Sequence, residues 1–346
     1  MQMYCKKIFL ALTAIILITA CGENNPHQID VSDVNVKVDL NRYEKEFFNI
    51  EEENFTEEFT ELRKKYPLKT ELMVEQILGF GRLDDKTGEF MIPLKERFYG
   101  DSYVRELNED IQEKYSPEKI EEMEDELTQA FKHLRHYYPD ATIPELYTTL
   151  TSFTYSIVTY EDIMGISLDM YMGQDYKFYP SMDFPDYKTR RMNEHYITPD
   201  VLTSWYLDQY PESEYTSNSL LSYMIYEGKA LYFLDVMMPE AHDSIKIQYT
   251  AEDLRWSQAH ESRIWDYFVE EDMLFETENH IHDRYIQDGP FTSSPGFPRE
   301  SAPRLGIWTG WQVVRSYMEN NEEVTFRELM EEQDYEKILR GSGYRP

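Results

Sequence analysis

The longest apolar stretch beyond the N-terminal region is residues 220–237, LLSYMIYEGKALYFLDVM, and it carries Glu227 and Lys229 near its middle. Read as a helix, this stretch aligns Glu227 with apolar residues three, four and seven positions away. A buried carboxylate without a partner is strongly unfavourable, so it takes up a proton or finds a cation and hydrogen-bond donors. We therefore expect a core helix in which a residue from elsewhere in the chain holds Glu227.

A helix expected over residues 304–318 offers such a residue. Arg304, Trp308, Trp311 and Arg315 recur at spacings of four, three and four residues, which places them on one helical face. Gly306 and Gly310, one turn apart, lower the helix propensity by about 1 kcal/mol each, which favours close approach of another element.

A second carboxylate, Glu261, faces an apolar stripe in a helix expected over residues 251–274. We predict that Arg304 or Arg315 pairs with Glu227 or Glu261, either as an ion-pair lock in the core or as part of a ligand site. The expected buried polar cluster comprises Glu227, Lys229, Glu261, Arg304 and Arg315, and the expected surface or cleft aromatics are Trp256, Trp265, Trp308 and Trp311.

The first 21 residues have the pattern of a bacterial lipoprotein signal. Lys6 and Lys7 precede an apolar run, and the sequence ITAC, residues 18–21, fits the lipobox whose Cys21 is lipidated. We predict a signal peptide over residues 1–20, a lipidated tether over residues 21–33 and a globular domain over residues 34–346. Several acyl chains together anchor a protein stably.

The expected location follows from the same region. Gly22 replaces the aspartate that commonly retains lipoproteins in the inner membrane, so a periplasm-facing outer-membrane position is mildly favoured. The polar residues 22–31 would reach at most about 35 Å when extended. We expect the membrane, through the lipid anchor, and other cell-envelope proteins as partners.

The charge of the chain excludes some partners. The formal net charge is −32 over 346 residues. So much negative charge argues against nucleic acid as a partner. Aromatic residues make up 15% of the chain, which is typical of a globular protein.

The sequence lacks the common catalytic and metal-binding motifs. None of the eight histidines begins an HExxH motif, and His260-Glu261 lacks a second ligand one turn on. His280 and His282 could be two ligands, but a metal site needs three or four. There is no GxSxG elbow, Walker A loop or Rossmann glycine pattern. We therefore expect no metal, no small-molecule cofactor and no enzymatic activity.

Local patterns predict an α+β fold, a mostly helical single domain with a small β-sheet. Helices dominate to about residue 140, including one over 96–115 and one over 117–138 that Ser116 caps. Strands are expected over residues 34–40, 148–160 and 166–171, where β-branched and aromatic residues alternate or gather. Residues 285–303, rich in proline and glycine, predict a long loop of the kind that is functional or packed down.

Several segments together resemble one family. YEGKALYF at residues 226–233, Glu261 with Trp265, RLGIWTGWQVVRSYM at residues 304–318 and the tail SGYRP are similar to the gliding-motility lipoproteins called GldB. The likeness extends over essentially the whole chain after the signal peptide, including DLNRYE at residues 39–44. It implies a membrane-anchored accessory of the gliding machinery that is not known to catalyse a reaction.

The family in turn resembles predicted zinc peptidases, which implies a peptidase-like half over residues 141–346. Residues 201–205, VLTSW, lie about where an HExxH motif would fall, so the resemblance implies a scaffold that has lost its metal and kept Glu227. Two alternatives stay open. One is an exported hydrolase that uses Glu227, Glu261 and His260 or His195, and the other is a ligand-binding lipoprotein with an aromatic pocket beneath residues 285–303.

Overall fold

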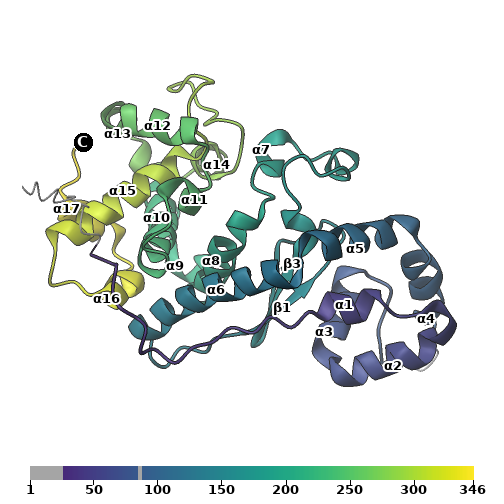
Figure 1. Ribbon diagram of the computed structural model, residues 1–346. Coiled ribbons are helices and arrows are strands. Elements are labelled where there is room, and N and C mark those ends of the chain that lie inside the picture. Colours follow the sequence, from purple (N-terminus) through teal and green to yellow (C-terminus); the bar gives the residue numbers. More distant parts are fainter. Residues whose placement is uncertain (1–25, 85–87) are drawn as a thin grey trace, which may run out of the picture.

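The computed structural model describes residues 26–84 and 88–346, so the predicted signal peptide and lipidation site Cys21 lie outside the described residues. Within the described ranges the molecule is elongated, with a helical lobe at one end, a small sheet in the middle and packed helices at the other end (Figure 1). The predicted α+β class is confirmed.

The sheet has three strands in the order β1-β3-β2. Strand β1 runs parallel to β3 and β2 runs antiparallel to β3. The strands are β1 (Glu145–Thr149), β2 (Ile157–Tyr160) and β3 (Ile163–Ser167). The strand-rich region was predicted correctly, but the strand bounds of 148–160 and 166–171 were not, because the turn at Glu161, with φ of 50°, makes β2 and β3 a tight hairpin and residues 168–171 form a short helix.

The N-terminal lobe has a hydrophobic core of its own, rich in aromatic rings such as Phe47, Phe55 and Phe98. The predicted helix over residues 96–115 is broken here, because a π-helical turn ends at Gly100 and Asp101 caps a new helix. The lobe and its exit helix comprise α1 (Tyr43–Phe48), η1 (Glu52–Asn54), α2 (Phe55–Lys65), α3 (Pro67–Glu71), η2 (Leu72–Ile77), α4 (Met91–Pro93), η3 (Leu94–Tyr99) and α5 (Ser102–Lys114).

Helix α6 (Pro117–Tyr137) joins the two ends of the molecule. It begins as predicted, with the Ser116 hydroxyl accepting a hydrogen bond from the Lys119 N–H. Its apolar face, including Leu127 and Phe131, belongs to the larger hydrophobic core rather than to the core of the N-terminal lobe.

The larger core is built around the crossing of α10 (Leu220–Met237) and α15 (Leu305–Asn320). The remaining elements around it are η4 (Leu168–Tyr171), η5 (Tyr179–Met182), α7 (Asp186–Thr189), η6 (Glu194–Tyr196), α8 (Ile197–Gln209), α9 (Glu212–Tyr215), α11 (Asp243–Ile247), α12 (Ala251–Ala259), α13 (Glu261–Glu270), η7 (Met273–Phe275), α14 (Asn279–Ile286), α16 (Phe326–Glu331) and α17 (Tyr335–Ser342). The single helix predicted over residues 251–274 is two helices, because the chain bends at His260.

Gly310, one of the two glycines predicted to meet a close neighbour, allows the α10–α15 crossing together with Gly228 of α10, whereas a Cβ on Gly306 would lie 2.9 Å from the Tyr285 carbonyl oxygen of α14. A Cβ placed on Gly310 would lie 1.7 Å from the Met224 carbonyl oxygen, and one on Gly228 would lie 2.4 Å from the Gly310 carbonyl carbon. The two backbones are therefore in direct contact, and any side chain at Gly310 would separate them.

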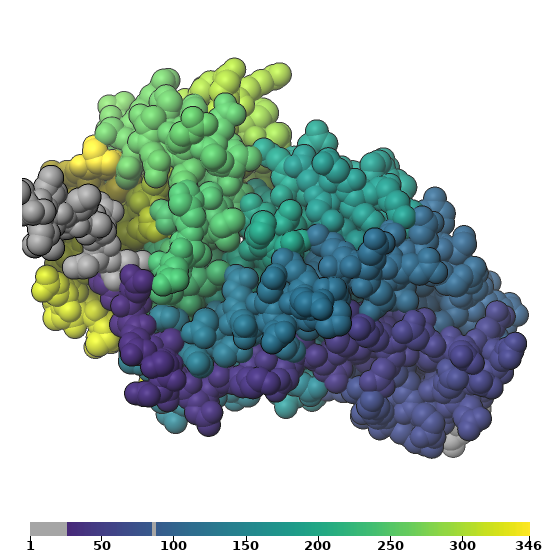
Figure 2. Space-filling model, viewed as in Figure 1, coloured from purple at the N-terminus to yellow at the C-terminus, as the bar shows by residue number. Residues whose placement is uncertain are grey.

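The segment before α1 runs in extended form along α6 instead of forming the strand predicted over residues 34–40 (Figures 1 and 2). Its backbone donors bond to side chains of α6: the Val38 N–H to Thr128 Oγ1 at 3.0 Å and the Leu40 N–H to Glu124 Oε1 at 2.7 Å. The backbone N–H groups of this segment therefore bond to side chains of a helix, where the N–H groups of a β-strand would bond to a neighbouring strand.

Part of the predicted tether is packed against the body. The His27 ring contacts the edge of Tyr232, the Gln28 amide donates to Glu240 at 2.9 Å, and Val31 is buried. The chain joins the body at His27, so the body lies closer to the anchor expected at Cys21 than a free tether over residues 21–33 would allow.

Candidate functional site

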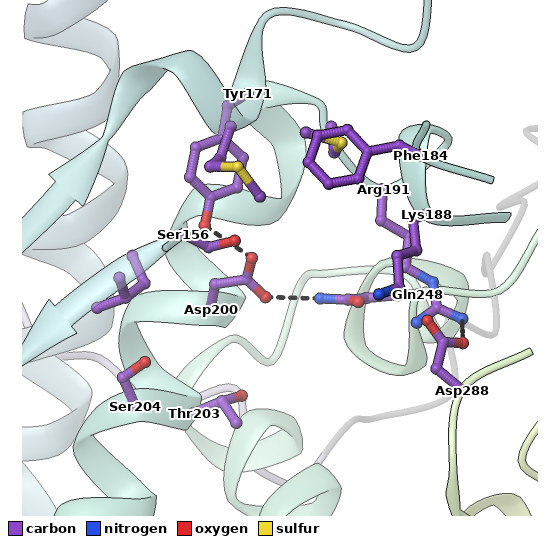
Figure 3. Close-up of a pocket in the computed structure, with 13 residues that line it drawn as sticks. Ser156, Tyr171, Phe184, Lys188, Arg191, Asp200, Thr203, Ser204, Gln248 and Asp288 are labelled. Atoms are coloured by element: carbon purple, nitrogen blue, oxygen red, sulfur yellow. Dashed lines mark hydrogen bonds and ion pairs between the residues drawn. The ribbon is translucent and has the colours of Figure 1, made fainter. Parts of the chain in front are cut away.

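A polar cavity of about 460 Å³ lies between the outer edge of β2 and helices α7 and α8 (Figure 3). Helix α8 turns Asp200, Thr203 and Ser204 toward it, at positions three and four residues apart on one helical face. The other polar residues of the wall are Ser156, Tyr171, Lys188, Arg191, Gln248 and Asp288.

Asp200 is the centre of this cavity. The Tyr171 hydroxyl donates to one carboxylate oxygen at 2.8 Å, and the Gln248 amide donates to the other at 2.6 Å (Figure 3). Burial raises the pKa of Asp200 to about 6, and these two hydrogen bonds with the charges of Arg191 and Arg304 limit the rise. Asp200 is therefore mostly ionised at pH 7, with both oxygens held by the protein.

The cationic wall is also neutralised internally. The Arg191 guanidinium pairs with Asp288 at 2.7 Å. Burial and the nearby charge of Arg304 lower the pKa of Arg191 to about 10, which leaves it protonated at neutral pH. Lys188 is exposed at the rim.

Glu227 lies on α10, outside the wall of this cavity. Burial raises its pKa to about 7, the charge of Arg304 opposes the rise, and Glu212 adds to it. Glu227 keeps some exposed surface, so its carboxylate is largely removed from water but is not fully enclosed by the protein. Arg304 donates its direct hydrogen bond to the Ile247 carbonyl, and so acts on Glu227 only through its field.

This burial predicts a pH effect on stability. Because the folded-state pKa of Glu227 lies above its unfolded value of 4.5, the protonated side chain stabilises the folded state. This stabilisation is fully present below pH 4.5 and is lost as pH rises through about 7. We expect Glu227→Gln to raise the free energy of unfolding at pH 8 by about 2 kcal/mol relative to the parent, and by much less at pH 5. Urea unfolding at both pH values measures this difference. Glu322→Gln, at an exposed position, is the control, and an equal effect of Glu227→Gln at both pH values would contradict the assignment.

Comparison with known proteins now identifies the family. The family model described as gliding motility protein GldB matches residues 24–346, which is essentially the whole chain. The chain belongs to the GldB family. No curated protein and no solved structure matches it, so the likeness to zinc peptidases remains a prediction.

Membership of the GldB family makes the chain a lipoprotein of the cell envelope associated with gliding motility. Among the described residues, no helix combines the length and apolarity needed to cross a membrane.

The arginine–glutamate pairing predicted for this GldB family member is wrong for Arg315. Arg315 pairs with Asp235 at 2.7 Å and with Asp243 at 2.8 Å, because Asp235, two turns beyond Glu227 on α10, lies opposite it. Asp235 also accepts from Lys246 at 2.8 Å and from Trp311 Nε1 at 2.8 Å. An ion-pair lock is present in the core, with aspartates in place of the predicted glutamates.

The other members of the predicted polar cluster lie apart. Glu261 accepts a hydrogen bond from the Tyr344 hydroxyl of the C-terminal tail at 2.7 Å. The Lys229 ammonium donates to the carbonyls of Met330 at 2.7 Å and Glu332 at 3.0 Å, and burial lowers its pKa to about 7. These contacts anchor the C-terminal helices to α10 and α13.

The predicted aromatic residues are mostly part of the core. Trp308 and Trp311 are buried. Trp256 stacks on the His260 ring and Trp265 packs edge-on against Tyr344. The tryptophans therefore pack the C-terminal helices together rather than line the cavity at Asp200.

Residues 285–303 border a cavity of about 450 Å³, whose wall includes Phe291 and Phe297 together with Arg284 and Arg299. Tyr267 packs on Phe297 and shares a hydrogen bond of 2.9 Å with Tyr285. The ligand-binding alternative stays a prediction.

Sequence reasoning missed the main residues of the cavity, Asp200, Tyr171, Arg191, Gln248 and Asp288. One signal was present, because Asp200, Thr203 and Ser204 share a helical face in a segment already compared with a lost HExxH motif. The other residues come from four separate segments, and only the fold brings them to Asp200. No group of three or more His, Cys, Asp or Glu suited to a metal was found among the described residues.

Proposed function

We propose that this chain is a non-catalytic binding component of the gliding machinery, anchored by lipid at Cys21 on the periplasmic face of the outer membrane. The observation that carries the binding role is the state of the cavity at Asp200. Both carboxylate oxygens accept hydrogen bonds from the protein, and Arg191 is paired with Asp288. Such a site is preorganised to recognise a group rather than to transfer a proton.

The arrangement of the rival hydrolase residues supports the same proposal. Glu261 is bound to Tyr344, and His260 contacts the Trp256 carbonyl through Nδ1 at 2.7 Å. Glu227 lies on α10, where the charges of Arg304 and Glu212 act on it. A nucleophile and its base need direct contact, and Glu261 and His260 have other partners.

Gliding by complemented cells tests the absence of catalysis. Cells that lack their own GldB protein would express the chain with Glu227→Gln and Glu261→Gln together, which removes both carboxylates of the hydrolase alternative while keeping side-chain volume nearly constant. We expect gliding speed within about twofold of the parent chain. Loss of gliding by a variant that still folds and reaches the membrane would favour the hydrolase.

Removal of the lipid anchor tests the membrane role. We expect Cys21→Ala to leave the protein in the soluble periplasmic fraction and to abolish gliding, because in this proposal the acyl chains on Cys21 hold the body at the membrane. Cell fractionation and motility tracking measure both effects. Cys5→Ala, within the predicted signal peptide, is the matched control and should behave like the parent. Normal gliding by the soluble Cys21→Ala protein would show that anchoring is dispensable.

A further inference from the structure

The two edges of the three-stranded sheet differ in whether another segment pairs with them. At the β1 edge, the Asn41 N–H donates to the Leu146 carbonyl at 3.1 Å and the Thr148 N–H donates to the Asn41 carbonyl at 2.9 Å, so the N-terminal segment covers that edge. No strand of the described residues pairs with the outer edge of β2. An uncovered edge is a template for pairing with another chain.

The register of β2 identifies the free backbone groups. The Ser167 N–H donates to the Ser156 carbonyl at 3.0 Å, so Ser156, Val158 and Tyr160 form the hydrogen-bonded pairs with β3. The N–H and C=O groups of Ile157 and Thr159 therefore point away from the sheet. Ile157 also lines the Asp200 cavity, so an incoming strand would run along its mouth.

Exposed apolar side chains occur in β2 and in the segments that line the cavity beside it. Four of the eight large hydrophobic residues that stand exposed in the described parts of the chain belong to these segments. Tyr160 ends β2 and Tyr155 precedes it, Leu207 follows Ser204 by one turn of α8, and Met182 precedes the cavity residue Phe184. Tyrosine and methionine are enriched at protein interfaces, so this surface resembles one before its partner binds.

The charges favour a basic partner. Asp200 presents a carboxylate at the cavity, and the exposed acids Glu161, Asp162 and Asp208 lie on the adjoining turn and helix. Arg191 is paired with Asp288, which leaves Lys188 as the cation of the rim. The net charge of −32 acts in the same direction.

We propose that the outer edge of β2 receives an extended segment of a partner protein as an added antiparallel or parallel strand, and that a lysine or arginine of this segment enters the cavity toward Asp200. Backbone pairing supplies affinity in this mode, and the side-chain pocket supplies specificity. This inference rests on the proposed binding role and names the chemistry of the partner.

Three defined peptides test the proposal. They are acetylated and amidated, of about seven alternating threonine and valine residues, with lysine, leucine or glutamate at the centre. We expect the lysine peptide to bind at least about tenfold more tightly than the glutamate peptide in fluorescence polarisation. We expect it to protect the amides of Ile157 and Thr159 from hydrogen exchange. Absence of binding at about 1 mM, or equal binding of all three peptides, would overturn the proposal.

Matched variants separate the two parts of the site. Thr159→Pro removes an outward N–H without removing a bond to β3, and should weaken all three peptides about tenfold, whereas Thr159→Ala keeps the N–H and should bind normally. Asp200→Asn should reduce the lysine preference to about twofold and leave leucine-peptide affinity unchanged. Circular dichroism and thermal melts establish that each variant is folded. Full affinity of folded Thr159→Pro would contradict pairing at the edge.

Mass spectrometry of the incubated peptides distinguishes this inference from the proposed function. Intact peptides with the expected affinities support both. Peptides that bind as expected and are then cleaved by the parent protein would overturn the non-catalytic role and leave the binding surface standing.

Discussion

Gly310→Ala is expected to prevent stable folding of the larger core. The added methyl group would lie 1.7 Å from the Met224 carbonyl oxygen, and both atoms belong to helices whose backbones touch. No side-chain rotation relieves such a contact, so α15 would have to move away from α10 and lose its packing. We expect a loss of more than about 3 kcal/mol, a large share of the 5–15 kcal/mol that stabilises a typical domain. Urea unfolding followed by circular dichroism measures it.

Gly289→Ala is the control for Gly310→Ala. A methyl group there would meet the Phe291 carbonyl oxygen at 3.4 Å, which is an ordinary contact, so the free energy of unfolding should change by less than about 0.5 kcal/mol. Gly228→Ala should behave like Gly310→Ala, because it meets the same crossing from the α10 side. A Gly310→Ala protein as stable as the parent would mean that the two helices do not cross as described.

Asp235→Asn is expected to destabilise the protein by about 3 to 5 kcal/mol, because it removes the negative charge from a buried cluster. Lys246 and Asp235 are each exposed by less than a tenth, and Arg315 and Trp311 donate to the same carboxylate. Loss of one partner leaves a buried ammonium and a partly buried guanidinium with only Asp243 to balance them. Thermal and urea unfolding at pH 7 measure the effect.

Asp39→Asn is the matched control for this charge. Asp39 also pairs with a lysine, Lys37, but both side chains are more than two thirds exposed, so screening by water leaves the pair worth little. We expect a change of less than about 0.5 kcal/mol. Equal effects of Asp235→Asn and Asp39→Asn would contradict a stabilising role for the buried cluster.

Local sequence determined the helices whose signals lie within them. Residues 220–237 form α10 over the predicted range because the stretch is mostly apolar and contains no proline, and Ser116 begins α6 because its hydroxyl satisfies a free N–H of the first turn. Gly306 and Gly310 also indicated a close contact with another helix. Glycine lowers helix stability, and close packing against a neighbouring backbone can offset that loss. The family resemblance was also readable from the sequence, and the family model confirms it.

Tertiary structure alone decided which charged groups meet. The sequence indicated that acids and arginines on apolar faces need partners, but not that Arg315 faces Asp235 while Glu227 lies in the field of Arg304. It likewise left Asp200 unassigned, because Tyr171, Arg191, Gln248 and Asp288 reach it from separate segments. Helical periodicity fixes which face a side chain lies on, whereas the partner across that face depends on how distant helices cross. For this protein the crossing of α10 and α15 placed Arg315 opposite Asp235.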